Sequence, residues 1–191
     1  MIHFDEASHT YTVNGKVLPS VSEIVGRIMP GQYADVPEHV LRLAAEFGTE
    51  VHTMIEIYNV HGLYLPAVDE RKNHCLDEYI RLSGHIKPLE NELIGYYKHY
   101  FAGCLDCVGE IDGKKYIIDY KTTSIFHRER VELQCSLYRL MYGWEDIAGL
   151  KCMWLPKNKK GRLYDLTSWD RDELLKRLIG VTVSENAQKN S

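Results

Sequence analysis

The sequence has 191 residues, of which 45% are hydrophobic, and a formal net charge of −4. A chain of this size can bury one hydrophobic core, and its negative charge excludes the general attraction to nucleic acid that a strongly basic protein has. Its first residues lack the basic and apolar segments of a signal peptide, and no stretch reaches the roughly 18 apolar residues of a membrane span. We therefore expect a soluble, cytoplasmic protein that does not bind membranes.

The cysteines indicate reduced thiols in the core, because they are odd in number and mostly lie in apolar runs. They are Cys75, Cys104, Cys107, Cys135 and Cys152. The second and third form a C-x-x-C motif, but residues three apart on a strand point to opposite faces, and no second pair follows at zinc-ribbon spacing. Neither a zinc site nor an iron–sulfur cluster is expected from this pattern.

The first 36 residues predict a β-hairpin and a short helix. Asn14 and Gly15 form a turn signal between two β-prone runs within residues 9–18. Ser20 and Glu23 have the spacing of a capping box, in which each side chain binds the backbone N–H of the other residue. A helix is therefore predicted to begin here and to end near residue 28.

Residues 38–60 predict a long amphipathic helix, with apolar residues three or four apart at Val40, Ala44, Phe47, Val51, Ile55 and Tyr58. Gly48, His52 and Glu56 form a second row on this helix. A helical glycine costs about 1 kcal/mol relative to alanine, so Gly48 indicates the close approach of another backbone or of a ligand. Glu56 is interpreted as a solvated charge.

The remaining elements predict an α/β fold in which helices flank a small mixed sheet. They are, in chain order, a helix at 69–83, strands at 92–100, 103–111 and 114–122, a helix at 127–142, strands at 147–155 and 162–169, and a helix from 170. All belong to one predicted domain, 1–191. It consists of the hairpin and helix (1–36), a core (37–156), a C-terminal strand and helix (157–183) and a flexible tail (184–191).

The strand pair joined by Asp112 and Gly113 contains the residues that point to chemistry. A two-residue turn there sets a register in which Asp106 lies opposite Asp119, with Lys121 on the same face. Directly opposed like charges destabilise a strand pair, so a shared proton, an exposed sheet edge or a divalent cation must offset the repulsion. The apolar run around Asp119 argues against the edge. The nearby lysine favours the cation, Mg²⁺ or Mn²⁺, in a site that hydrolyses phosphate esters.

These residues resemble the motifs of the PD-(D/E)XK nuclease superfamily, and specifically its RecB-like exonuclease branch. Asp106 matches the first strand aspartate, and Asp119 and Lys121 match the D/E-x-K triplet. The predicted order helix, three strands, helix, strand also resembles the family's restriction-endonuclease-like core (α-β-β-β-α-β). The resemblance spans roughly residues 40–155.

Two helical motifs make the resemblance more specific. They are Gly48-x-x-x-His52 on the helix before the strands and Gln134-x-x-x-Tyr138 on the helix after them. The i, i+4 spacing places Gln134 and Tyr138 on one helix face. In iron–sulfur relatives three cysteines cluster after the core, but here only Cys152 lies beyond the second core helix, so no iron–sulfur cluster is expected.

The resemblance implies a role for each matched residue. His52, Asp106 and Asp119 would bind Mg²⁺ or Mn²⁺, with the backbone carbonyl of Tyr120 as a further ligand; Lys121 would assist the attacking water, and Gln134 and Tyr138 would support the active site and the DNA strand. Glu92, with Glu90 close by, and Gly48 are additional candidates.

The implied function is a Mg²⁺-dependent DNA exonuclease of phages or mobile elements that acts in DNA processing or recombination, with DNA as its partner. Three alternatives remain open at the level of the sequence. They are an endonuclease of the same fold, a catalytically silent DNA-binding module, and a hydrolase of a small phosphoester.

Overall fold

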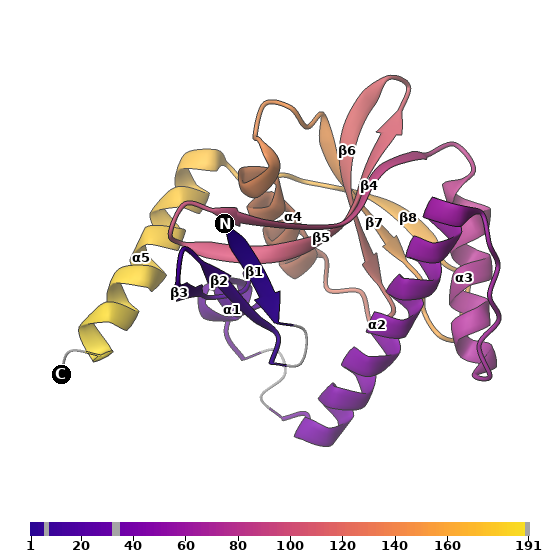
Figure 1. Cartoon of the computed structure of the whole chain (residues 1–191), viewed down its shortest axis with the longest axis horizontal. Coiled ribbons are helices and arrows are strands. Elements are labelled where there is room, and N and C mark those ends of the chain that lie inside the picture. The colour runs from indigo at the N-terminus through magenta and orange to yellow at the C-terminus, as the bar shows by residue number, and fades with distance from the viewer. Residues whose placement is uncertain (6–7, 32–34, 190–191) are drawn as a thin grey trace.

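A computed structural model describes residues 1–5, 8–31 and 35–189, with the side chains of 184–189 excepted, and shows a mixed α/β fold (Figure 1). The described elements are β1 (Ile2–Asp5), β2 (Thr10–Val13), β3 (Lys16–Leu18), α1 (Val21–Ile28), α2 (Glu38–His61), α3 (Glu70–Ser83), β4 (Lys87–Tyr97), β5 (Phe101–Ile111), β6 (Lys114–Lys121), α4 (Arg128–Tyr142), β7 (Gly149–Trp154), β8 (Arg162–Leu166) and α5 (Arg171–Lys189). None of these helices is long and apolar enough to cross a membrane.

The larger sheet has the strand order β4-β5-β6-β7-β8 and mixes antiparallel and parallel pairs. Strands β4, β5 and β6 form an antiparallel meander, whereas β6 and β7 are parallel. Parallel neighbours need a crossover connection, and α4 supplies it. The predicted small mixed sheet flanked by helices is therefore present.

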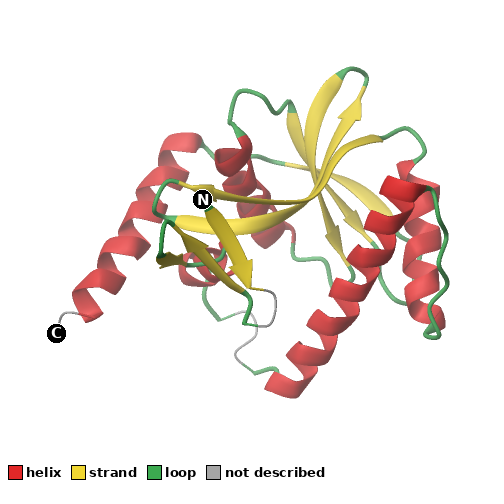
Figure 2. Cartoon of the chain, viewed as in Figure 1, coloured by secondary structure: helices red, strands yellow, loops and turns green. Residues whose placement is uncertain are grey.

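Helices cover both faces of this sheet (Figure 2). On one face α1, α4 and α5 pack over a cluster that contains Ile117 and Leu133. On the other face α2 and α3 pack over a second cluster, in which Val51 of α2 and Ile118 of β6 take part. The alternation of Ile117 and Ile118 between the two clusters follows from the two-residue period of a strand. Polar side chains inside such a sheet are costly unless they have partners, which makes the buried Asp106 and Asp119 notable.

The N-terminal strands β1, β2 and β3 form a separate antiparallel sheet beside the β4–β5 end of the larger one. Tyr11, Val13 and Leu18 pack against Ala102 of β5. The Ala102 N–H donates to the carbonyl of Pro19 at 3.0 Å. These contacts fix the N-terminal sheet to the strands that carry the candidate site.

The local signals in this segment agree with the structure. Asn14 and Gly15 have φ of 50° and 78°, the left-handed conformations that a tight hairpin turn requires. The Ser20 hydroxyl accepts from the Glu23 N–H at 3.1 Å, and the Ser20 N–H donates to Glu23 Oε2 at 2.7 Å, which confirms the capping box. The sequence predicted a hairpin alone; the preceding strand β1 adds a third strand to it.

The boundaries of two elements differ most from those predicted. Strand β4 begins at Lys87, five residues before the predicted start. Helix α5 continues to Lys189 and so includes most of the segment that was expected to be a flexible tail. That segment contains helix-forming residues and no glycine or proline, which favours continuation of the helix. Residues 190–191 of the predicted tail lie outside the described residues.

Candidate functional site

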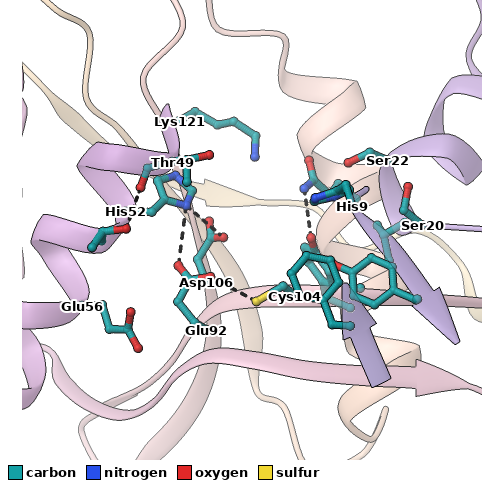
Figure 3. A pocket seen from close by; sticks show the side chains of 17 residues that line it. His9, Ser20, Ser22, Thr49, His52, Glu56, Glu92, Cys104, Asp106 and Lys121 are labelled. Atoms are coloured by element: carbon teal, nitrogen blue, oxygen red, sulfur yellow. Dashed lines mark hydrogen bonds and ion pairs between the residues drawn. The ribbon is translucent and has the colours of Figure 1, made fainter. Parts of the chain in front are cut away.

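Three potential metal ligands converge from α2, β4 and β5 (Figure 3). One ligand atom from each of His52, Glu92 and Asp106 lies within 4.8 Å of the others. Nδ1 of His52 is 3.4 Å from Asp106 Oδ1 and 3.7 Å from Glu92 Oε1. The three side chains are 23%, 29% and 10% exposed, so they face a largely desolvated space. We refer to this group as the His52–Glu92–Asp106 cluster.

An interruption in the sheet creates room for the cluster. The β4–β5 ladder includes the pairs Asn91↔Cys107 and Leu93↔Leu105 but omits the pair between them, Glu92 with Asp106. Glu92 has φ of 46°, a left-handed conformation that is uncommon for a residue in a strand. Strain of this kind concentrates at functional sites, where the surrounding structure holds it in place.

The predicted pairing of Asp106 with Asp119 is not part of the β5–β6 ladder, although the predicted register is confirmed up to Cys107. The ladder between β5 and β6 follows the predicted register from Ile111↔Lys114 to Cys107↔Ile118, and it ends there. Asp106 therefore does not form a ladder pair with Asp119. Instead Asp106 Oδ2 accepts a hydrogen bond of 2.6 Å from the backbone N–H of Tyr120. A side-chain bond to β6 thus follows the end of the ladder at the point where the carboxylates were expected to face each other.

Asp119 contacts Lys121 and does not belong to the cluster. Its side chain is 0% exposed, and its carboxylate lies 2.7 Å from Nζ of Lys121. The thiol of Cys152 is 3.8 Å from the same carboxylate. The structure thus gives Asp119 a cationic partner, and the predicted binding of a metal by Asp119 stays a prediction. Glu92, a secondary candidate in the sequence, takes the third position of the cluster.

Tyr120 contributes both of its backbone groups to the site. Its N–H holds Asp106, and its carbonyl oxygen lies 3.2 Å from Nε2 of His52. A neutral His52 that donates from Nε2 to this carbonyl keeps its Nδ1 lone pair directed at the two carboxylates. The carbonyl of Tyr120, which the sequence predicted to be a metal ligand, is therefore positioned to orient the His52 ring.

The pKa values show a site that attracts positive charge. Burial lowers the pKa of His52, but Asp106 and Glu92 outweigh burial and raise it to about 9. Burial also lowers the pKa of Lys121, whereas Asp119 and Asp106 raise it to a net value above the usual range. Burial raises the pKa of Asp119 to about 6 despite the opposing effect of Lys121. Without metal, protonated His52 and Lys121 supply the charge that compensates the carboxylates.

The cluster opens into a cavity of about 550 Å³. One wall is α2, which contributes Thr49, His52, Thr53 and Glu56; the remaining lining residues are Phe4, His9, Tyr11, Ser20, Val21, Ser22, Glu92, Gly103, Cys104, Asp106, Lys121, Gln134 and Tyr138. Gln134 Nε2 donates to the Tyr138 hydroxyl at 3.2 Å, which confirms that the two residues share a helix face. The cavity thus brings together His52, Asp106, Lys121, Gln134 and Tyr138 from the predicted set.

Several lining residues were not predicted from the sequence. Glu56, interpreted as a solvated charge, lines the cavity, as do Phe4, His9 and Tyr11 of the N-terminal sheet. Glu56 lies one turn after His52 on α2, so its i, i+4 spacing was an available signal. The residues of the N-terminal sheet gave no comparable signal, because only the packing of that sheet against β5 brings them to the site.

Gly48 lies outside the cavity, and its nearest neighbour is the Thr122 hydroxyl, 3.5 Å from the position of an added Cβ. This is an ordinary contact and does not require glycine. We expect Gly48→Ala to fold and to raise the free energy of unfolding by up to about 1 kcal/mol, since alanine is the better helix former. Urea unfolding of the variant and the wild type measures the change. A loss of more than about 1 kcal/mol would show that Gly48 is needed for close packing.

Comparison with known proteins does not identify a family. No protein-family model matches the sequence, and no curated protein matches it. Among solved structures, one titled "Crystal structure of SSO0001" is similar over 90% of this chain and 78% of its own, with 13% sequence identity and a TM-score of 0.49.

Proposed function

We propose that this chain is a DNA nuclease that uses Mg²⁺ or Mn²⁺ to hydrolyse phosphodiester bonds. The observation that carries the proposal is the arrangement in one cavity of the His52–Glu92–Asp106 cluster and the ammonium group of Lys121. A metal site beside a positioned cation suits a reaction in which negative charge develops on phosphate oxygens.

The donor atoms of the cluster fit the proposed metals. Two carboxylate oxygens are hard ligands that suit Mg²⁺ and Mn²⁺, and one imidazole nitrogen is also acceptable to Mn²⁺. Such a metal, when bound, would hold the phosphate and lower the pKa of a water molecule. The interrupted ladder and the Tyr120 backbone hold the ligands in place for it.

Lys121 acts in this proposal as a charged donor. Asp119 favours its ammonium form, so Lys121 orients a water or a phosphate oxygen and neutralises developing charge, and it does not remove the proton from the water. Asp119 positions Lys121. Gln134 and Tyr138 lie along the same cavity and offer amide and hydroxyl groups to the DNA strand.

We also propose that the chain is related to the PD-(D/E)XK nuclease superfamily. The element order α2, α3, β4, β5, β6, α4, β7 supports this likeness, since it contains the order helix, three strands, helix, strand, with α3 as an additional helix between α2 and β4. The Gln134-x-x-x-Tyr138 motif favours the RecB-like branch and therefore an exonuclease, acting in the DNA processing or recombination of a phage or mobile element. An endonuclease of the same fold is the second candidate.

Cleavage of defined DNA substrates tests the proposal. With Mg²⁺ or Mn²⁺ we expect degradation of linear DNA and no degradation of covalently closed circular DNA, and we expect EDTA to abolish the activity because the carboxylates alone cannot activate water. Asp106→Ala should be inactive, whereas Glu110→Ala, on the same strand but outside the cavity, should retain activity. Cleavage of the closed circle would instead identify an endonuclease. If no substrate is cleaved with either metal, the chain is not a DNA nuclease.

A further inference from the structure

The N-terminal sheet forms part of the wall of the cavity that contains the His52–Glu92–Asp106 cluster. The proposed reaction assigns no role to the residues of this sheet. Phe4 of β1, Tyr11 of β2 and His9 between the two strands line the same cavity as His52 and Lys121. Figure 3 shows His9 on the other side of this cavity from His52, Glu92 and Asp106. A phosphate held by the cluster would therefore have an aromatic surface next to it.

The three rings form a compact group. Phe4 and Tyr11 are stacked, with ring centroids 4.5 Å apart and an angle of 23° between the rings. The His9 ring is nearly perpendicular to both, at 5.3 Å from Phe4 and 5.7 Å from Tyr11. These distances place His9 beside the stacked pair and not on top of it.

The exposure of the rings shows which one can meet a ligand. Tyr11 is 2% exposed and Phe4 is half-buried, whereas His9 is exposed. The backbone of His9 is left-handed, with φ of 49°, and the adjacent Ser8 hydroxyl donates to Asp5 Oδ2 at 2.8 Å. His9, directly before β2, is thus the exposed ring of the three at the cavity.

We propose that His9, supported by Phe4 and Tyr11, stacks on the nucleobase next to the scissile phosphate and thereby selects single-stranded DNA. This inference rests on the proposed nuclease function. An aromatic ring can stack on any base, but the faces of a paired base are already covered by its neighbours in the duplex. The cavity of about 550 Å³ has the size of a small-ligand pocket, which suits one or two unpaired nucleotides and not a double helix.

Binding of a fluorescein-labelled oligonucleotide with a cleavage-resistant phosphorothioate backbone, measured by anisotropy with Mg²⁺, tests the inference without requiring cleavage. We expect His9→Asn to weaken binding of the single strand about 5- to 150-fold, as the loss of one base stack predicts. Asparagine accepts the left-handed backbone, so this variant should fold. His9→Phe should retain the affinity, because phenylalanine keeps an aromatic face.

His3→Asn is the matched control, since His3 is an exposed histidine of β1 that does not line the cavity. It should bind as the wild type does. The same variants are also tested on a duplex of the same sequence, for which His9→Asn should change little. Unchanged binding of the single strand by His9→Asn, equal weakening for both substrates, or equal losses in His9→Asn and His9→Phe would each overturn the inference. A chain that binds single strands through His9 but cleaves nothing would refute the nuclease proposal alone.

Discussion

Replacing Glu92 by glutamine is expected to lower the affinity for Mn²⁺ by roughly tenfold or more, while Asp119→Asn leaves it nearly unchanged. The reason is that Glu92 belongs to the His52–Glu92–Asp106 cluster, whereas Asp119 is held by Lys121. Titration calorimetry with MnCl₂ measures both affinities. The experiment separates two ligand sets, because the sequence motif alone assigns Asp119 to the metal.

Glu90→Gln provides the control for this prediction. Glu90 lies on the same strand two residues away, but its carboxylate accepts from the Tyr142 hydroxyl at 2.9 Å, outside the cavity. It should bind Mn²⁺ as the wild type does. If Asp119→Asn lost as much affinity as Glu92→Gln, Asp119 would be a metal ligand and the ligand set derived from the structure would be wrong.

Replacing Lys121 by methionine is expected to slow DNA cleavage by about 100- to 1000-fold, the usual cost of removing one donor that stabilises transition-state charge. Its effect on the affinity for Mn²⁺ should be small, because Lys121 contacts Asp119 and not the cluster. Single-turnover cleavage at saturating Mn²⁺ measures the rate. Methionine keeps most of the packing volume of the lysine stem.

Lys151→Met is the matched control for Lys121. Lys151 is also a strand lysine paired with an aspartate, Asp165, but it does not line the cavity. Because Lys121→Met leaves the buried Asp119 without a cation, thermal unfolding of each variant must accompany the rate measurement. A folded Lys121→Met protein that cleaves DNA at the wild-type rate would remove Lys121 from the mechanism.

Local rules predicted the parts of this structure that depend on neighbouring residues. The Asp112-Gly113 turn set the register of β5 and β6 correctly up to Cys107, since a two-residue turn determines which residues face each other. The capping box and the apolar spacing located α1 and α2 for the same reason. His52 on α2 and Asp106 on β5 were brought together as candidates by the resemblance of their motifs to one nuclease family.

The rest depends on contacts that no local rule contains. The end of the β5–β6 ladder before Asp106 and the left-handed backbone of Glu92 arise where three strands and α2 meet. The sequence could not choose between Glu90 and Glu92, because only the structure shows which one turns toward His52. The aromatic residues of the N-terminal sheet reach the cavity because that sheet packs on β5, where Ala102 bonds to Pro19, 83 residues earlier in the sequence.

The hydrogen bond between Asp106 and Tyr120 also limits how Asp106 can coordinate. Oδ2 is committed to a buried backbone N–H, which would lose its partner if the carboxylate rotated, at a cost of about 1–3 kcal/mol. This hydrogen bond holds the carboxylate in one orientation, so in the proposed metal site Asp106 would bind the ion mainly through Oδ1. Fewer protein oxygens on the ion leave more of its coordination sphere to water and substrate, which favours a small octahedral cation that retains waters over a larger ion that needs many protein ligands.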